Sequence, residues 1–208
     1  MKNFLKIASG WDVGSLLLEL HRQPHLWDRN KARLSERGPH RETHDIWVRY
    51  KDETENVKRG DYKDFGDPHD GVWYPAYYEL PSLRPIIFKL MAMVEGERLG
   101  GILLYSVPPG KRIHPHTDIG WHVDYYEKFN VCLQSNERAL FFYGKNEGDI
   151  DEAMAAEPGD VHRFVNNVPH WVVNSGEDDH IVLTVCIRTH DYGARHVGLQ
   201  EVPHARAA

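Results

Sequence analysis

Two short segments far apart in the sequence carry side chains suited to binding one metal ion. His116 and Asp118 stand in the first segment, and His170 stands in the second. Successive side chains of an extended strand point to opposite faces, so His116 and Asp118 share a face from which Thr117 points away. Two imidazoles and one carboxylate leave the opposite side of a metal open, which is the ligand arrangement of non-haem Fe(II) oxygenases. Zinc is more often enclosed by four ligands or by three ligands and a water, and a chain with 2 cysteines offers no cysteine-rich shell.

A histidine two positions before an aspartate is weak evidence by itself, because most histidines only satisfy local hydrogen bonds. The surrounding turns strengthen the metal interpretation. Pro109-Gly110 precedes the first segment, and Pro158-Gly159-Asp160 is a tight turn that returns a later strand beside an earlier one. His170 stands at the start of a predicted strand. A jelly roll would therefore bring the three ligands together at one end of the barrel.

The composition is that of an ordinary soluble protein. With 41% hydrophobic and 27% charged residues, the 208 residues are enough for one domain that buries its own core. A formal net charge of −6 argues against nucleic-acid binding, and no apolar run approaches the roughly 18 residues of a membrane span. The first residues are too polar for a signal peptide. Cys132 and Cys186 fall in predicted strands as small buried thiols, so we expect a cytoplasmic protein without disulfides.

Two helices are predicted in the first half of the chain. Leucines recur at helical spacing between Asp12, a candidate N-cap, and Pro24, which ends the first helix. The second helix begins at Ser82 and is predicted to close at Gly100-Gly101. The long charged segment 51–72 is either a lid over the site or a disordered loop.

Short extended runs separated by turn residues dominate the second half of the chain. Many short strands with such turns predict a sandwich or jelly roll, with the helices packed on one side. We therefore expect one mainly β domain, in which an N-terminal segment (1–99) with helices and one strand precedes a jelly-roll core (100–190) and a C-terminal tail (191–208). The predicted strands are 45–50, 102–107, 127–134, 139–143, 154–157, 161–165, 170–174 and 180–188.

Four motifs follow one another in a characteristic order. They are Pro109-Gly110, Pro115-His116-Thr117-Asp118, Pro158-Gly159-Asp160 and Pro169-His170-Trp171-Val172-Val173-Asn174. In this order and spacing the chain resembles the aspartyl/asparaginyl β-hydroxylase group of Fe(II)- and 2-oxoglutarate-dependent dioxygenases, and it is also similar to bacterial proline hydroxylases. The resemblance implies a cupin-like double-stranded β-helix with catalytic iron on His116, Asp118 and His170. It also implies that dioxygen and 2-oxoglutarate serve to hydroxylate an unactivated C–H bond of an amino acid or peptide side chain.

The same resemblance indicates where 2-oxoglutarate would bind. Relatives usually carry a basic residue that grips the far carboxylate of 2-oxoglutarate at the position of His180. An imidazole is mostly neutral at pH 7 unless an acid raises its pKa, whereas an arginine is always charged. His180 therefore binds the carboxylate more weakly, shares the task with Lys128, or is a structural histidine at a strand end. Asn130 shares the face of Lys128, and Tyr105 stands where the hydroxyl of a relative contacts the same carboxylate.

The candidate substrate residues have equally ordinary alternatives. Trp47 and Arg49 either face the substrate, where Arg49 would suit a carboxylate or phosphate, or form an ordinary strand pair. Trp171 either covers the iron or belongs to the core. Two other functions stay open: a cupin-like metal enzyme that does not use 2-oxoglutarate, and a non-catalytic module that keeps a metal for structure.

Overall fold

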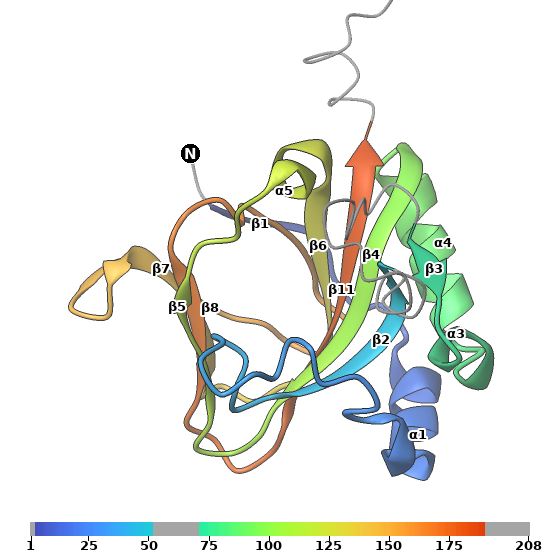
Figure 1. Cartoon of the computed structure of the whole chain (residues 1–208), viewed down its shortest axis with the longest axis horizontal. Coiled ribbons are helices and arrows are strands. Elements are labelled where there is room, and N and C mark those ends of the chain that lie inside the picture. Colours follow the sequence, from blue (N-terminus) through green and yellow to red (C-terminus); the bar gives the residue numbers. More distant parts are fainter. Residues whose placement is uncertain (1–2, 52–70, 190–208) are drawn as a thin grey trace, which may run out of the picture.

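Two antiparallel β-sheets face each other in the computed structural model, which describes residues 3–51 and 71–189 (Figure 1). The larger sheet has the strand order β1-β9-β6-β11-β4-β2-β3, and the smaller sheet has the order β5-β10-β7-β8. From β4 to β11 the chain crosses repeatedly between the sheets, which is the connectivity of a jelly roll. The predicted mainly β architecture is confirmed. The strands are β1 (Phe4–Ala8), β2 (His44–Tyr50), β3 (Val72–Trp73), β4 (Gly96–Val107), β5 (Arg112–His116), β6 (Glu127–Gln134), β7 (Ala139–Asn146), β8 (Asp149–Ala155), β9 (Val161–Phe164), β10 (His170–Asn174) and β11 (His180–Thr189).

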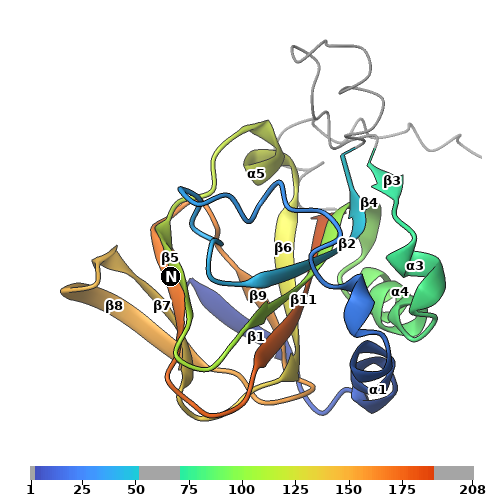
Figure 2. The same cartoon turned by 60° about the horizontal axis from the view of Figure 1, so that its bottom comes forward.

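The helices gather on the outer face of the larger sheet, as the sequence predicted. In Figures 1 and 2, α1, α3 and α4 all lie on the side of that sheet away from the smaller one, while α5 stands at one end of the barrel. Each longer helix has an apolar face that must be covered, and the sheet covers it. The helical elements are α1 (Gly14–Arg22), the 3₁₀ turn η1 (Pro24–Leu26), α3 (Ala76–Glu79), α4 (Leu83–Met93) and α5 (Trp121–Tyr125).

Two apolar clusters stabilise these layers. The first lies between the helices and the larger sheet, and its fully buried leucines and isoleucines include Leu16, Leu83, Ile87, Leu90, Leu104 and Leu183. The second lies between the two sheets and is rich in aromatic rings, among them Phe4, Tyr105, Phe141, Tyr143 and Phe164. Each fully buried side chain of this size contributes about 1.5–3 kcal/mol relative to an exposed one. The first cluster therefore holds the helices on the sheet, and the second holds the barrel closed.

Strand β4 shows how the sequence divides its side chains between the two clusters. Ile102 and Leu104 face the helices, whereas Leu103 and Tyr105 face the space between the sheets. Alternation of side chains along a strand produces this division. The even and odd positions of one strand thus serve the core and the site respectively.

The N-terminal segment contributes three strands before β4, where the sequence predicted one. β1 pairs with β9, and β3 pairs with β2 through Trp73 and its neighbour. Neither extra strand has a clear alternating pattern, because β3 has only two residues and β1 exposes Leu5 at 54% while burying Phe4. Pairing with neighbours, rather than local propensity, makes these segments extended.

The prediction that Gly100-Gly101 closes the second helix is wrong. Helix α4 ends at Met93, and both glycines lie inside β4. A Cβ atom on Gly100 would stand 2.9 Å from the Tyr126 ring and 3.0 Å from Cys186 Cβ. The glycine is therefore required by the close approach of a ring to the strand, and it does not act as a helix cap.

Parts of the sequence-based predictions fall outside the described residues. Nearly all of the candidate lid, 51–72, and the whole tail, 191–208, belong to those parts. Among the helices that the structure describes, none has the length and apolarity needed to cross a membrane.

Candidate metal centre

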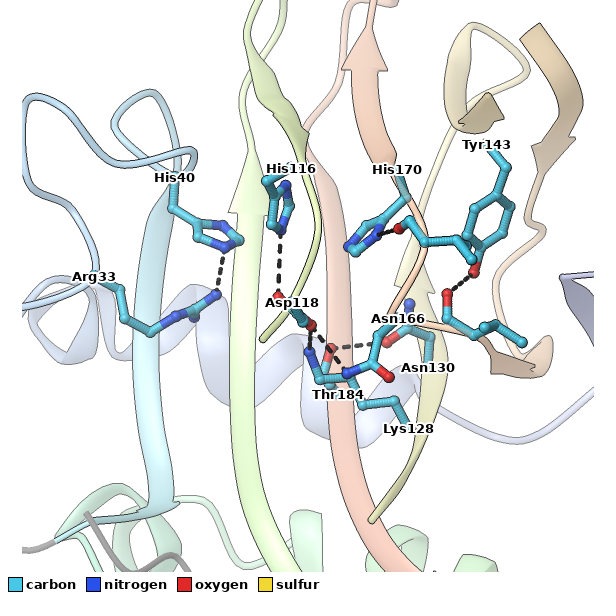
Figure 3. A network of polar contacts seen from close by, with 12 residues as sticks. Arg33, His40, His116, Asp118, Lys128, Asn130, Tyr143, Asn166, His170 and Thr184 are labelled. Carbon is cyan, nitrogen blue, oxygen red and sulfur yellow. Dashed lines mark hydrogen bonds and ion pairs between the residues drawn. The ribbon is translucent and has the colours of Figure 1, made fainter. Parts of the chain in front are cut away.

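The two predicted histidine ligands lie directly opposite each other on paired strands of the smaller sheet. His116 is the last residue of β5, His170 is the first residue of β10, and the two are register partners. Their ring centroids are 4.4 Å apart, and Figure 3 shows both rings beside the same space. Directly opposed residues of an antiparallel pair lie on the same face, so the strand register brings the imidazoles together.

Asp118 reaches the same place from the loop that follows β5. The sequence predicted a strand carrying both His116 and Asp118, but β5 ends at His116. The backbone N–H of Asp118 donates to the carbonyl oxygen of Asn166 at 3.0 Å, which fastens the loop beside the segment leading to β10. One ligand atom from each of His116, Asp118 and His170 lies within 4.8 Å of the others. The predicted convergence of these three side chains is therefore present.

Two donors hold one oxygen of the Asp118 carboxylate. Lys128 on β6 forms an ion pair with Oδ2, and the Asn166 side-chain amide donates to the same oxygen at 3.1 Å. Burial opposes ionisation of this carboxyl, but the Lys128 ammonium outweighs burial and holds the pKa of Asp118 below its usual range. The other oxygen, Oδ1, lies 3.6 Å from His116 Nε2. The carboxylate is thus ionised and presents one oxygen toward the histidines.

Backbone carbonyls fix the orientation of both imidazoles. His116 Nδ1 donates to the carbonyl oxygen of His114 at 2.8 Å, and His170 Nδ1 donates to that of Val168 at 2.8 Å. The proton on Nδ1 leaves the Nε2 lone pair of each ring available to a metal. Burial lowers the pKa of both rings, that of His170 to about 4. Both imidazoles are therefore neutral at pH 7, as metal ligands must be.

A cavity of about 380 Å³ opens beside these ligands, between the two sheets. His116 and His170 border it from the smaller sheet and Asp118 from the loop after β5, while Lys128, Asn130 and Thr184 border it from the larger sheet. The cavity also has apolar walls, which include Phe141, Phe164 and Val172. A volume of this order holds a small organic molecule.

Three of the four predicted 2-oxoglutarate residues line this cavity. They are Lys128, Asn130 and Tyr105. Thr184 donates its hydroxyl proton to Asn130 Oδ1 at 2.8 Å, so the Asn130 NH₂ group is the part of the amide that can donate to a ligand. Burial raises the pKa of Tyr105 well above its usual value, which keeps the phenol protonated as a donor. The structure brings these groups together on the inner face of the larger sheet.

His180 lies elsewhere, behind the main cavity. It borders a second space of about 10 Å³ that also touches Tyr105 and Asn130. Its Nδ1 atom lies 2.9 Å from the Ser135 hydroxyl, and burial lowers the pKa of the ring to about 4. The ring is therefore neutral at pH 7 and offers a hydrogen bond rather than a charge. A role for His180 at the co-substrate stays a prediction.

The predicted substrate residues do not line the cavity. Trp171 is buried and stacks on Phe142, with centroids 5.5 Å apart. Arg49 donates to the Gly100 carbonyl oxygen at 2.9 Å and lies over the Trp73 ring. Trp47 is covered by neighbouring aromatic rings. In the described part of the chain these contacts match the ordinary structural alternatives, and substrate contacts by the three residues stay a prediction.

Sequence reasoning missed several residues of the site. Arg33 and His40 line the cavity from the irregular segment between η1 and β2, which has no periodic pattern that could have indicated them. Asn166 lies in the irregular segment between β9 and β10, which likewise has no periodic pattern. Thr184 could have been found, because it falls on the same strand face as His180 in the predicted strand 180–188.

Proteins of similar structure are known, although similar sequences were not found. No protein-family model matches the chain, and no curated protein matches it. A 2OG-Fe(II) oxygenase family oxidoreductase from Burkholderia pseudomallei has a similar structure, with a TM-score of 0.52 and 14% identity over 82% of this chain and 78% of that chain. A prolyl-4-hydroxylase from Pseudomonas putida has a TM-score of 0.51 and 14% identity over 90% of this chain and 92% of that chain.

A third similar structure is a Trichoplax adhaerens prolyl hydroxylase in complex with a peptide fragment of the hypoxia inducible factor oxygen degradation domain. Its TM-score is 0.56 at 13% identity, over 92% of this chain and 86% of that chain. The chain folds as a double-stranded β-helix. At these identities the likeness shows the fold alone. One fold serves many reactions, so the chemistry of this chain depends on the residues of its own site.

Proposed function

We propose that this protein is an Fe(II)- and 2-oxoglutarate-dependent dioxygenase that hydroxylates a C–H bond. The observation that carries the proposal is the convergence of His116, Asp118 and His170 on one side of a cavity that extends beyond them. Two neutral imidazoles and one carboxylate form the three-ligand face of non-haem iron oxygenases. The fold shared with 2OG-Fe(II) oxygenases and prolyl hydroxylases supports the same interpretation.

The residues present fit an iron ion. Both histidines keep Nε2 available, and Asp118 Oδ1 faces them while Oδ2 is held by Lys128 and Asn166. This arrangement favours one-oxygen coordination by Asp118. When bound, iron supplies the oxidative chemistry: 2-oxoglutarate is decarboxylated to succinate, one atom of dioxygen enters succinate, and the other enters the substrate C–H bond.

The inner face of the larger sheet supplies what 2-oxoglutarate requires. Lys128 carries the positive charge, and its ammonium has three donors, so it can contact a ligand while it pairs with Asp118. Asn130 and Tyr105 add neutral donors. These groups orient the co-substrate, and the apolar walls exclude bulk water from the reacting atoms.

An amino acid or peptide side chain is the substrate class that we propose. The motif resemblance to aspartyl/asparaginyl β-hydroxylases supports this assignment, as does the similar prolyl hydroxylase whose structure contains a peptide fragment. A cupin-like enzyme that does not use 2-oxoglutarate is the second candidate. The neutral state of His180, where relatives carry a cation, favours that alternative.

The test uses the protein with Fe(II) and 2-oxoglutarate in the absence of oxygen. We expect the visible charge-transfer band of a chelated keto acid to appear in the wild type, and to be lost in His116→Ala and His170→Ala because each removes an iron ligand. At Fe(II) concentrations that saturate both proteins, Lys128→Met should require more 2-oxoglutarate than the wild type for the same band. Iron binding without any band at high 2-oxoglutarate would favour the cupin-like alternative, and full iron occupancy in either histidine variant would contradict the ligand assignment.

A further inference from the structure

An arginine from outside the jelly-roll core enters the cavity. Arg33 belongs to the segment between η1 and β2, which runs from the helical side of the molecule to β5 (Figures 1 and 2). Its side chain lines the same cavity as the candidate metal ligands and retains 19% exposure. Figure 3 shows Arg33 and His40 on the side of His116 away from His170, whereas Lys128 and Asn130 belong to β6 and Thr184 to β11.

Two contacts hold the Arg33 guanidinium in place. Nη1 donates to Oδ2 of Asp45 at 2.8 Å, and the Asp45 side chain is completely buried. Nη2 donates to His40 Nε2 at 2.9 Å. A guanidinium has five N–H donors, so these two bonds leave others for a ligand. Because Asp45 lies on β2, the sheet itself sets the position of the charge.

The segment that carries Arg33 is also fastened to the metal-bearing strand. The backbone N–H of His114 on β5 donates to the Pro39 carbonyl oxygen at 2.9 Å, and His114 Nε2 lies 2.7 Å from Oε1 of Glu42. The His40 ring lies against the His116 ring, with centroids 5.2 Å apart. Arg33 is thus preorganised relative to the metal ligands, because its segment is anchored to both β2 and β5.

His40 is the second residue that holds Arg33. Because Nε2 accepts a hydrogen bond from Arg33, the ring proton belongs on Nδ1. In the described part of the chain, His40 Nδ1 is buried and has no hydrogen-bond partner. Nδ1 has almost no accessible surface, so it does not face the cavity, and His40 contributes through Nε2, which holds Arg33.

We propose that Arg33, held by Asp45 and His40, binds an anionic group of the primary substrate, so that the substrate of this enzyme carries a carboxylate or a phosphate. This inference rests on the proposed function, because it leaves 2-oxoglutarate to Lys128, Asn130 and Tyr105. The planar fork of an arginine is the side chain best suited to both anions. Arg33 acts here as a specificity-determining residue, at a distance from the oxidised bond.

Inorganic sulfate is the probe for this subsite, titrated calorimetrically into protein loaded with Mn(II) and saturated with 2-oxoglutarate. Arg33→Gln alone would leave Asp45 buried and unpaired, so the test variant is the double substitution Arg33→Gln with Asp45→Asn. Asp45→Asn alone keeps the guanidinium but removes the charge that holds it, so it separates the anchor from the anion-binding group. Arg37→Gln removes an exposed charge from the same segment and is the control.

We expect sulfate binding to weaken at least tenfold in the double variant, to weaken less than that in Asp45→Asn, and to change less than threefold in the control Arg37→Gln. The affinity for 2-oxoglutarate should be the same in all four proteins. Equal sulfate affinity in the wild type and the double variant, or no binding to either, would overturn the proposal. A tenfold loss of 2-oxoglutarate affinity with unchanged sulfate binding would overturn it too, since Arg33 would then serve the co-substrate.

A titration of 2-oxoglutarate into the Mn(II)-loaded wild type, beside the sulfate titrations, separates this proposal from the proposed function. If the wild type fails to bind 2-oxoglutarate but sulfate binding still depends on Arg33, the anion subsite stands and the dioxygenase assignment fails. If the anaerobic charge-transfer band forms and sulfate binding is independent of Arg33, the dioxygenase assignment stands and the anion subsite fails.

Discussion

Replacement of Asn166 by alanine should weaken metal binding without removing any metal ligand. The Asn166 amide donates to Asp118 Oδ2 at 3.1 Å, and only Lys128 shares that task in the described structure. The change leaves the carboxylate charge in place but frees the carboxylate to rotate away from the histidines. Asn166 is 6% exposed, so water replaces the amide poorly.

The magnitude follows from the kind of bond that is lost. A hydrogen bond to a charged group contributes about 1.5–3 kcal/mol, and substitution of groups that orient metal ligands typically lowers metal affinity about 10–100-fold. The two figures agree, since a 10–100-fold change corresponds to about 1.4–2.7 kcal/mol. We therefore expect Asn166→Ala to raise the Mn(II) dissociation constant by one to two orders of magnitude.

The assay is competition for Mn(II) between the protein and a chromophoric chelator at pH 7. Asn146→Ala, in the exposed hairpin between β7 and β8, is the matched control and should bind Mn(II) like the wild type. Circular dichroism checks that both variants are folded. If Asn166→Ala keeps the wild-type affinity within about twofold, Asn166 does not orient the carboxylate, and our account of how the ligand is held is refuted.

Two further predictions concern stability. Gly100→Ala should lower the free energy of unfolding by about 1–3 kcal/mol in a urea titration, because the new methyl meets the Tyr126 ring at 2.9 Å; an unchanged midpoint would show that the ring moves away freely. His180 has a pKa of about 4 when folded and near 6.5 when unfolded, so the unfolded state binds more protons between these values and stability falls as the pH drops through this range. From pH 7 to pH 5 the free energy of unfolding of the wild type should fall by about 2 kcal/mol more than that of His180→Gln. Equal decreases in the two proteins would contradict a buried, neutral His180.

Much of the fold follows from local patterns in the sequence. Alternation and turn residues predicted β4, β6, β7, β9, β10 and β11, whereas the run 154–157 overlaps only the last two residues of β8. Apolar residues at helical spacing predicted α1 and α4. Both kinds of pattern arise from the geometry of a single segment, so neighbouring residues suffice to reveal them. The patterns failed at β1 and β3, which are extended because they pair with distant strands, and at Gly100, where a ring from elsewhere in the chain requires a glycine.

The candidate metal ligands are the part of the site that the sequence determined by itself. His116, Asp118 and His170 were identified from their types and their positions beside strands and turns, and the strand register brings the two histidines into opposition. Lys128, Asn130 and Tyr105 were placed by the resemblance, and they line the cavity as expected.

Only the tertiary structure decided which other charges face that cavity. Arg33 enters from an irregular segment, whereas His180 is withdrawn behind Tyr105 although its strand was correctly predicted. Asp118 lies past the end of its strand and depends on Lys128 and Asn166. Strand alternation tells which face a side chain takes, but the packing of distant segments determines whether that side chain reaches the cavity, a neighbouring ring or an ion-pair partner.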